Sequence, residues 1–389
     1  MAVDLPQPGA KVPFNRAVLT GCEFEYLLKA VRNMHIAGDG PFGRRCEALL
    51  QESIGCHRAL LATSCTSALE MAALLLDLEP GDEVIVPAYT FVSTANAFVV
   101  HGATPVFADV RDDTLNLDES LLEGLITPRT RAVVPVHYAG VGCDMDALCA
   151  VAKRHDLAII EDNAHGLFGA YRAKPLGSFG RFATLSFHET KSFTCGEGGG
   201  LVINDPADIS RAEIIRDKGT DRSRFFRGEV DKYTWVDVGS SYVMADILAG
   251  FLLAQLEGRR SVLSTRSTIW HQYMEGLREW AAERGVRLPF VPDECDHAYH
   301  LFHLRMPSAD DRTAFIEHLR ARGIGAVFHY VPLNTSPMGM RFGGRDGQCP
   351  VAERAGDTLV RLPLWNAMSA EDVAVVIDAV TSYACTSGA

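Results

Sequence analysis

A single lysine lies between an apolar strand and a glycine-rich loop. The predicted strand Phe182–Phe187 leads to Lys191, and the loop Ser192–Gly200 then leads to a second predicted strand, Leu201–Asn204. Partial burial at such a place lowers the pKa of a lysine and makes its amine nucleophilic. A lysine that forms a Schiff base needs these properties, although a solvated loop lysine is the plainer explanation for one residue taken alone.

Three further features follow predicted strands, at the edge where open α/β sheets bind ligands. Hydroxyl residues in Thr63–Leu69 follow the short strand Ala59–Ala62 and open a helix, whose free N–H groups suit a phosphate. Asp162 follows the buried strand Ala158–Glu161 and needs a cationic or hydrogen-bonding partner, such as a protonated pyridine nitrogen. An aromatic side chain in Pro87–Phe91 could stack on a flat ring. The plainer explanations are an N-cap, a capping aspartate and a core aromatic.

Together the four features match the requirements of pyridoxal 5'-phosphate. They supply a phosphate cradle, a ring-stacking aromatic, a carboxylate for the ring nitrogen and a lysine for the aldehyde. In such chemistry the protein orients the cofactor and tunes its electronic properties. The combination is more specific than any one of its members.

The elements that would position these residues alternate between strand and helix. The pattern predicts further strands at Glu83–Val86, Pro105–Asp109 and Ala132–Val136, and helices at Thr66–Leu76 and Asp144–His155. Apolar strands separated by helices favour a mostly parallel sheet that is covered on both faces.

The pattern changes after about residue 240, where one long helix is predicted from Tyr242 to about Trp280. The elements predicted after it are a strand at Tyr299–Arg305, a helix at Asp310–Arg322, a strand at Gly325–His329 and helices at Val351–Val360 and Ala370–Ser382. We therefore expect a large α/β domain over residues 1–245 and a smaller α+β domain over residues 246–389.

The composition excludes several classes of protein. The 389 residues include 37 Lys and Arg against 49 Asp and Glu, a net charge of −12, which argues against non-specific nucleic-acid binding. Ten cysteines without a CxxC pair indicate reduced thiols and no zinc cage. Residues 1–20 contain no apolar signal-peptide core, and no apolar run approaches transmembrane length. We expect a cytoplasmic protein with no membrane partner.

Longer motifs resemble the DegT/DnrJ/EryC1/StrS family of sugar aminotransferases, over nearly the whole chain. The motifs are Gly81–Pro87, Thr90–Thr94, Pro135–Gly140, Glu161-Asp162, and Ser186-Phe187-His188 with Lys191. The resemblance implies the aspartate aminotransferase fold (fold type I), with a mostly parallel seven-stranded sheet in the large domain. Closer similarity to the dTDP-4-amino-4,6-dideoxygalactose transaminases lies in Arg216–Gly228, Asp231–Trp235, Gly239–Tyr242 and Val327–Tyr330.

The resemblance also implies roles for single residues. Lys191 would bind the cofactor covalently, Asp162 would pair with its ring nitrogen, and His165 would lie near its phenolic oxygen. The remaining expected cofactor contacts are Phe91 on the ring, Thr66, Ser67 and Ser186 on the phosphate, Cys65 beside them, and Ser241, whose position reaches the phosphate of the neighbouring subunit. The expected substrate contacts are His188, His329 and Tyr330. Independently of the resemblance, the basic residues Arg222, Arg224 and Lys232 of an otherwise acidic chain suit the diphosphate of a sugar nucleotide, although they could instead form a solvated face. Ser241 replaces an asparagine found in much of the family, and Asn334 replaces a histidine.

The implied activity is a ping-pong transamination from L-glutamate to C4 of dTDP-4-keto-6-deoxyglucose, with pyridoxamine 5'-phosphate as the intermediate form of the cofactor. The implied assembly is a homodimer with shared active sites. Alternatives are a C3 ketone or a UDP-linked sugar as acceptor, a pyridoxamine-phosphate-dependent sugar dehydratase, whose members carry histidine in place of Lys191, and a non-catalytic regulatory protein that binds the cofactor. A metal site at His297, His300 and His303 is less consistent with the sequence than a strand there, and we expect no metal.

Overall fold

The computed structural model describes residues 11–384 of the chain. Residues 1–10 lie outside this range, and they are the first half of the stretch 1–20 in which the sequence predicts no signal peptide. The last five residues of the predicted domain 246–389 also lie outside it. Within residues 11–384, no helix combines the length and the apolar character needed to cross a membrane.

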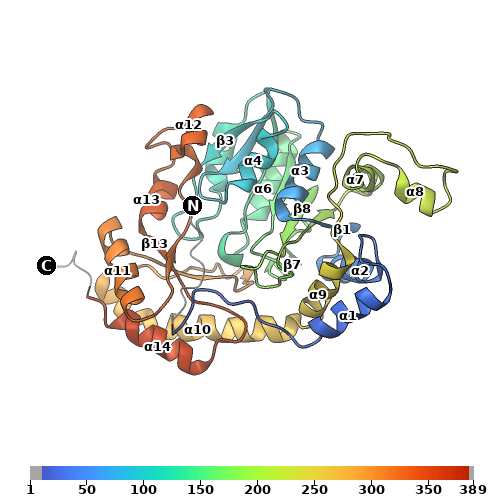
Figure 1. The fold of residues 1–389 in the computed structure, drawn as a ribbon. Helices are drawn as coiled ribbons and strands as arrows, with labels where there is room; N and C mark the ends of the chain where they lie inside the picture. The colour runs from blue at the N-terminus through green and yellow to red at the C-terminus, as the bar shows by residue number, and fades with distance from the viewer. Residues whose placement is uncertain (1–10, 385–389) are drawn as a thin grey trace.

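A seven-stranded sheet forms the centre of the structure (Figure 1). In spatial order its strands are β1 (Arg58–Ala62), β9 (Gly199–Ile203), β8 (Phe182–Ser186), β5 (Ala158–Asp162), β4 (Thr130–Val133), β2 (Glu83–Pro87) and β3 (Thr104–Ala108). Within this sheet only β9 runs antiparallel to its neighbours, so the predicted mostly parallel seven-stranded sheet is confirmed. The strands are short apolar runs because both of their faces are buried.

Helices cover both faces of this sheet. The alternation of side chains along each strand shows which helices lie on which face. In β1, Leu60 and Ala62 point to one face, and Ala59 and Leu61 to the other. The first face packs against α3 (Cys65–Leu75), α4 (Ser93–Val99) and α7 (Ile209–Arg216). The second packs against α2 (Pro41–Ile54), α5 (Leu122–Leu125), α6 (Met145–Arg154) and α9 (Asp246–Glu257), and α1 (Glu23–Arg32) lies on α9.

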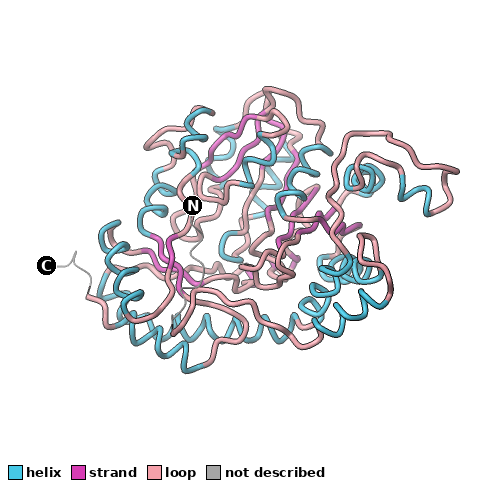
Figure 2. Tube along the Cα trace, viewed as in Figure 1, coloured by secondary structure: helices cyan, strands magenta, loops and turns pink. Residues whose placement is uncertain are grey.

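The C-terminal part of the chain has its own core and a small antiparallel sheet, which lies apart from the central sheet (Figure 2). The sheet order is β11 (Phe302–Arg305), β13 (Leu359–Leu362), β12 (Val327–Phe328). Its core side packs against α10 (Arg259–Arg284), α11 (Ala309–Ala321) and α14 (Ala370–Thr381). Shorter elements are α8 (Arg222–Phe226), α12 (Pro337–Arg341), α13 (Pro350–Thr358) and the strands β6 (Ala170–Tyr171), β7 (Lys174–Pro175) and β10 (Cys295–Asp296).

The prediction of one helix from Tyr242 to Trp280 is wrong. The chain forms α9 and α10, which meet at Gly258. A Cβ atom at Gly258 would lie 2.9 Å from Cβ of Thr20, whose hydroxyl donates to the carbonyl of Ala254 at 3.0 Å. The helix therefore breaks where the N-terminal segment crosses it, and α9 packs with α1 and α2 while α10 packs with α14.

Strand β13 is the second difference, because the sequence predicts a helix that continues to Val360. The helix ends at Thr358, and the Leu-Val-Arg-Leu segment that follows becomes the central strand of the small sheet. The predicted strand at 299–305 is also shorter than expected and begins at Phe302. A four-residue strand with two partners far away in sequence leaves little local signal.

We predict that Gly199→Ala destabilises the protein and that Gly200→Ala does not. A Cβ atom at Gly199 would lie 2.2 Å from the carbonyl carbon of Ser64 and 2.3 Å from the nitrogen of Cys65, both of them backbone atoms. At Gly200 its nearest neighbour would be the oxygen of Leu60 at 3.5 Å, which is ordinary contact. Overpacking of this kind costs about 1–3 kcal/mol or more. Thermal denaturation midpoints of the two variants measure the difference, and equal midpoints would contradict the prediction.

Candidate active site

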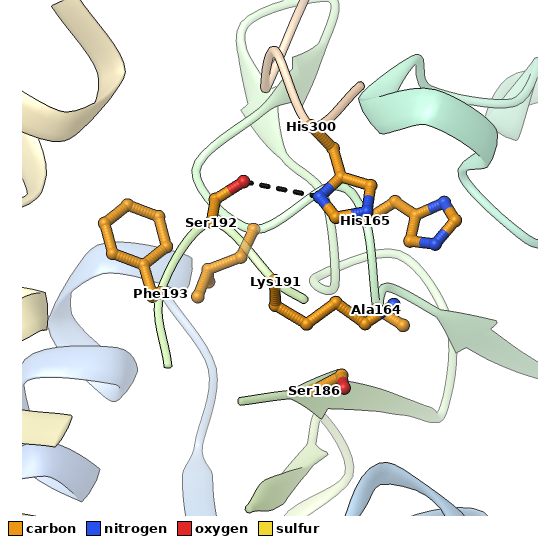
Figure 3. A pocket seen from close by; sticks show the side chains of 8 residues that line it. Ala164, His165, Ser186, Lys191, Ser192, Phe193 and His300 are labelled. Carbon is orange, nitrogen blue, oxygen red and sulfur yellow. Dashed lines mark hydrogen bonds between the residues drawn. The ribbon is translucent and has the colours of Figure 1, made fainter. Parts of the chain in front are cut away.

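Lys191 lies in a small pocket beyond the end of β8. The residues that line the pocket are Ala164, His165, Leu167, Ser186, Lys191, Ser192, Phe193 and His300. Figure 3 shows the lysine side chain extending from its loop toward Ala164, with Ser186 on the strand below it. The turn is held by a hydrogen bond from the backbone N–H of Lys191 to the carbonyl of His188, at 2.9 Å.

The amine of Lys191 has an environment that disfavours its charge. Burial lowers the pKa of Lys191, and the positive charge of Arg361 lowers it further, while Cys65 and Asp162 act in the opposite direction. Within residues 11–384, no hydrogen-bond or ion-pair partner holds its Nζ atom. The neutral, nucleophilic form of the amine is therefore favoured relative to an ordinary lysine.

Asp162 ends strand β5 and is buried. The hydroxyl of Thr94 donates to its Oδ2 at 2.8 Å, and the backbone N–H of Ala164 donates to its Oδ1 at 3.2 Å. Thr90 pairs in turn with the hydroxyl of Thr94 at 2.8 Å. These contacts fix the direction of the carboxylate at the sheet edge that also carries Lys191. Thr94 belongs to the family motif Thr90–Thr94, and its hydrogen bond orients the carboxylate of Asp162.

Helix α3 begins in the segment where the sequence predicts a phosphate cradle. Ser64 caps the helix by accepting a hydrogen bond from the N–H of Ser67 at 3.0 Å, so the helix begins at Cys65. The Thr66 hydroxyl donates to Ser93 at 2.7 Å. Strand β9 passes close by, because Gly199 leaves room for Ser64 and Cys65 and pairs with Ser186 on β8. Burial raises the pKa of the Cys65 thiol to about 12, so this thiol stays protonated.

Two buried histidines form the wall opposite the lysine. The rings of His165 and His300 stack at 4.2 Å, and the hydroxyl of Tyr330 lies 3.5 Å from Nε2 of His165. Nδ1 of His329 and the hydroxyl of Tyr138 share a hydrogen bond of 2.7 Å. Burial holds the pKa of His165, His300 and His329 well below the usual range, so all three are neutral at physiological pH. Nδ1 of His165 has no partner within the described residues.

The C-terminal part of the chain braces the loop that carries Lys191. Arg266 on α10 donates to the carbonyls of Tyr299 (2.8 Å) and His300, and to the side-chain oxygen of Asn366 at 2.9 Å. Asn366 donates to the carbonyl of Ser192 at 3.0 Å, and Ser192 pairs with Nδ1 of His300 at 3.3 Å. Neither Arg266 nor Asn366 is predicted as a site residue, since each is a lone polar residue in a segment without a motif.

The structure brings only some of the predicted site residues together. Lys191, His165 and Ser186 line one pocket, and Phe91 lies 6.3 Å from Tyr330 between ring centres, with half of its surface exposed. His188 lies on the same loop and faces Glu197 at 3.7 Å.

The basic residues 222, 224 and 232 lie elsewhere, on a segment that projects from the body of the chain around α8 (Figure 1). Arg222 pairs with Asp217 at 3.4 Å and Arg224 with Glu229 at 3.2 Å, while Lys232 is exposed. Ser241 is exposed at the base of this segment, where its backbone forms an isolated antiparallel β-bridge with that of Asp217. None of these residues lines the Lys191 pocket of its own chain.

The three histidines considered for a metal site diverge. His297 contacts the carbonyl of Ala139 at 3.1 Å, His300 faces Ser192, and His303 packs against Tyr138. The strand begins at Phe302, so His303 belongs to it, while His300, which lies within the predicted strand Tyr299–Arg305, does not. Within residues 11–384 no group of three or more acidic, histidine or cysteine side chains could hold a metal ion.

We predict that Lys191→Met raises the stability of the cofactor-free protein at pH 7. Folding lowers the pKa of Lys191, so the charge of this lysine reduces the free energy of unfolding. The reduction is complete at pH values below the lowered pKa. The reduction fades as pH rises toward about 10.4, the pKa of an unfolded lysine. Thermal midpoints should therefore differ most at neutral pH and converge at alkaline pH. The exposed Lys153 is the matched control, and equal effects of Lys153→Met and Lys191→Met would contradict the prediction.

Comparison with known proteins identifies the family of the chain. The sequence profile of the DegT/DnrJ/EryC1/StrS aminotransferase family matches residues 19–381. GDP-perosamine synthase of Caulobacter vibrioides is 34% identical over 383 residues, which cover 97% of this chain and 98% of that protein. The spore coat polysaccharide biosynthesis protein SpsC of Bacillus subtilis is 35% identical, over 88% of this chain and 89% of its own.

Solved structures show the same architecture. Spr1654 of Streptococcus pneumoniae in its PMP form superposes with a TM-score of 0.89 at 29% identity, over 95% of this chain and 98% of that one. The aminotransferase TlmJ of Streptoalloteichus hindustanus gives a TM-score of 0.87 at 29% identity, with the same coverage of both chains. The fold type I prediction is thus confirmed. The chain belongs to the DegT/DnrJ/EryC1/StrS aminotransferase family and is a pyridoxal-phosphate-dependent sugar aminotransferase.

Proposed function

We propose that the enzyme transfers an amino group from L-glutamate to C4 of a nucleotide-linked 4-keto-6-deoxy sugar. The acceptor we favour is dTDP-4-keto-6-deoxyglucose, and the product is dTDP-4-amino-4,6-dideoxygalactose. The observation that carries the proposal is Lys191, a partly buried amine that has no partner among the described residues and lies at the same sheet edge as the fixed carboxylate of Asp162. A dehydratase is disfavoured because its members carry histidine at the position of Lys191.

The residues around Lys191 fit the cofactor. Asp162 is a buried carboxylate held at both oxygens, which suits a protonated ring nitrogen, and the partnerless Nδ1 of His165 suits an oxygen of the ring. Phe91 offers an exposed ring for stacking. The end of α3 with Cys65, Thr66 and Ser67, together with Ser186, suits the phosphate. When bound, the cofactor serves as the electron sink for cleavage of a C–H bond.

Lys191 has two tasks in this proposal. Its neutral amine holds the cofactor in the resting enzyme, and once the amino donor has displaced it, the same amine takes the proton from the donor carbon and delivers it again. The lowered pKa serves both tasks, because the unprotonated amine is the nucleophile and the base. His188 lies on the same loop, and His329 and Tyr330 lie on the opposite wall, where we expect the acceptor sugar to contact them.

The nucleotide of the acceptor has two candidates. The motifs between residues 216 and 242 support a dTDP sugar, and a UDP sugar or a C3 ketone carries no independent support. The 34% identity to GDP-perosamine synthase supports a GDP-linked 4-keto-6-deoxy sugar as the second candidate. The absorbance of the cofactor-loaded enzyme, followed with each acceptor in turn, distinguishes the two candidates.

We further propose that the enzyme is a cytoplasmic homodimer whose projecting segment completes the partner's site. The segment exposes 69% of Phe226 and 76% of Trp235, which is unusual for side chains that face only water. Its cations Arg222, Arg224 and Lys232 suit a nucleotide diphosphate, and Ser241 at its base would approach the phosphate of the neighbouring cofactor.

We predict that L-glutamate removes the visible absorbance of the cofactor-loaded enzyme and that dTDP-4-keto-6-deoxyglucose restores it. Lys191→Ala should lower turnover by a factor of at least about 1,000, because nucleophile and base are lost together. Restoration by a GDP-linked 4-keto-6-deoxy sugar instead would select the second candidate. Absorbance that responds to neither glutamate nor a keto sugar would contradict the proposed function.

We predict that replacing Arg222, Arg224 and Lys232 with alanine raises the KM for the sugar nucleotide at least about tenfold, because charged hydrogen bonds to phosphate are lost. The reaction with L-glutamate should be unchanged. Mixing this variant with Lys191→Ala should recover activity, since one mixed site would combine an intact lysine with an intact segment. An unchanged KM, or no recovery on mixing, would place the three cations outside the shared site.

A further inference from the structure

The imidazole of His165 is not oriented by strong hydrogen bonds of its own. Its Nδ1 atom is enclosed and has no partner within residues 11–384, and its Nε2 atom lies 3.5 Å from the hydroxyl of Tyr330. His137 contrasts with it, since Nε2 of His137 lies 3.0 Å from a carboxylate oxygen of Glu161, and Nδ1 accepts the N–H of Cys143 at 3.2 Å. Bonds of that kind orient a histidine ring, so a different contact must orient His165.

This contact is the ring of His300. The rings of His300 and His165 stack with their centres 4.2 Å apart and an angle of 24° between their planes. Figure 3 shows the ring of His300 between Ser192 and the ring of His165. Nδ1 of His300 and the hydroxyl of Ser192 share a hydrogen bond of 3.3 Å, which limits rotation of the His300 ring. Because stacked rings pack face to face, the plane of His300 sets the plane of His165.

The stacked pair carries no charge at physiological pH. Burial lowers the pKa of both rings well below the usual range, so protonation does not drive them apart. Burial also raises the pKa of Tyr330, whose hydroxyl therefore donates toward Nε2 of His165 and leaves the ring proton on Nδ1. The titratable and charged groups that face His165 include no carboxylate, and they are Lys191, His300, His329, Tyr138, Tyr330 and Arg361.

Arg266 on α10 fixes the backbone that carries His300. The preceding residue, Tyr299, has a φ of 51°, in the left-handed region that a tyrosine rarely adopts. Nε of Arg266 donates to the carbonyl of Tyr299 at 2.8 Å, and a second nitrogen of the same guanidinium donates to the carbonyl of His300. Such a backbone conformation persists only where the surroundings hold it, and here one guanidinium holds two consecutive carbonyls.

The charge of Arg266 does not stabilise the fold through an ion pair. The residue is 3% exposed, and within residues 11–384 no carboxylate pairs with it. Burial lowers the pKa of Arg266 to about 9, so its charge opposes folding, and an apolar side chain would fill the same space at lower cost. What the guanidinium supplies is a fixed position for the turn of His300 and, through Asn366, for the carbonyl of Ser192.

We propose that Arg266 and His300 are positioning residues that hold the imidazole of His165 toward the ring oxygen of the cofactor. The inference rests on the proposed contact between Nδ1 of His165 and that oxygen. A hydrogen bond from a neutral imidazole stabilises negative charge on the oxygen, and it weakens the hold of the oxygen on the protonated nitrogen that joins Lys191 to the cofactor. The pKa of that nitrogen should therefore rise when His165 is misaligned.

The test is a pH titration of the resting, cofactor-loaded enzyme with no amino donor or acceptor present. Its readout is the absorbance midpoint, which is the pH at the centre of the change in visible absorbance. His165→Phe should raise the midpoint by about 1, because a hydrogen bond to a charged oxygen is lost. Arg266→Met and His300→Ala should raise it by about 0.5, because the bond is misaligned but not removed. His300→Phe keeps a flat ring and should lie closer to wild type than His300→Ala does.

The control is Arg305→Met. Arg305 is also a buried arginine of the C-terminal part, but its guanidinium pairs with Asp112 at 2.8 Å and does not contact the turn of His300. This variant should lower the thermal midpoint and leave the absorbance midpoint as in wild type. If Arg266→Met does not fold, His300→Ala still tests the stacking, since it keeps all the hydrogen bonds of Arg266.

Three results overturn the inference. Wild-type absorbance midpoints in His300→Ala and in the folded Arg266→Met, beside a raised midpoint in His165→Phe, overturn it and leave the proposed contact of His165 intact. Equal shifts in Arg305→Met and Arg266→Met also overturn it, because the shift would then follow from a general loss of stability. An unchanged midpoint in His165→Phe overturns both the contact and the inference, while the proposed transfer to a keto sugar is judged by its own assay.

Discussion

Burial of the Lys191 amine without a counter-charge is the constraint around which the rest of the site is arranged. A free carboxylate beside the amine would hold it protonated and would block its use as a nucleophile. Asp162, which ends the neighbouring strand β5, accepts hydrogen bonds from Thr94 and Ala164 instead of pairing with the lysine. The amine therefore stays unpaired, while the carboxylate keeps a fixed direction for the ring nitrogen of the cofactor.

The wall of the site opposite Lys191 also carries few charges. His165, His300 and His329 are buried and neutral, and they are held by stacking and by tyrosine hydroxyls rather than by carboxylates. Burial raises the pKa of Tyr330, so its hydroxyl remains a neutral donor. The charge of Arg361 contributes to the lowered pKa of Lys191, His165 and His329, because a desolvated surrounding screens charge poorly.

Contact between the two parts of the chain completes the site. Asp112 follows β3 of the central sheet and accepts hydrogen bonds from Arg287, Arg305 and Arg354 of the C-terminal part. Burial opposes the charge of Asp112, but these arginines outweigh it and lower its pKa. Arg266 and Asn366 make a second link, which ends on the carbonyl of Ser192 beside Lys191. Small shifts of the C-terminal part would thus reach the lysine loop directly.

Local sequence patterns were enough to predict the central sheet and the residues at its edge. Short apolar runs between helices predict parallel strands, and polar residues that follow such strands must meet at one edge, so Lys191, Asp162 and the α3 cradle could be placed together from local pattern alone. Tertiary structure alone decided which distant segments complete the site. Strand β13 forms only between β11 and β12, and its first two residues fall in the helix that the sequence predicts up to Val360. The break at Gly258 depends on Thr20, and the stacking of His165 on His300 joins residues 135 positions apart. No periodicity in a window of ten or twenty residues records such contacts, because they depend on long-range packing.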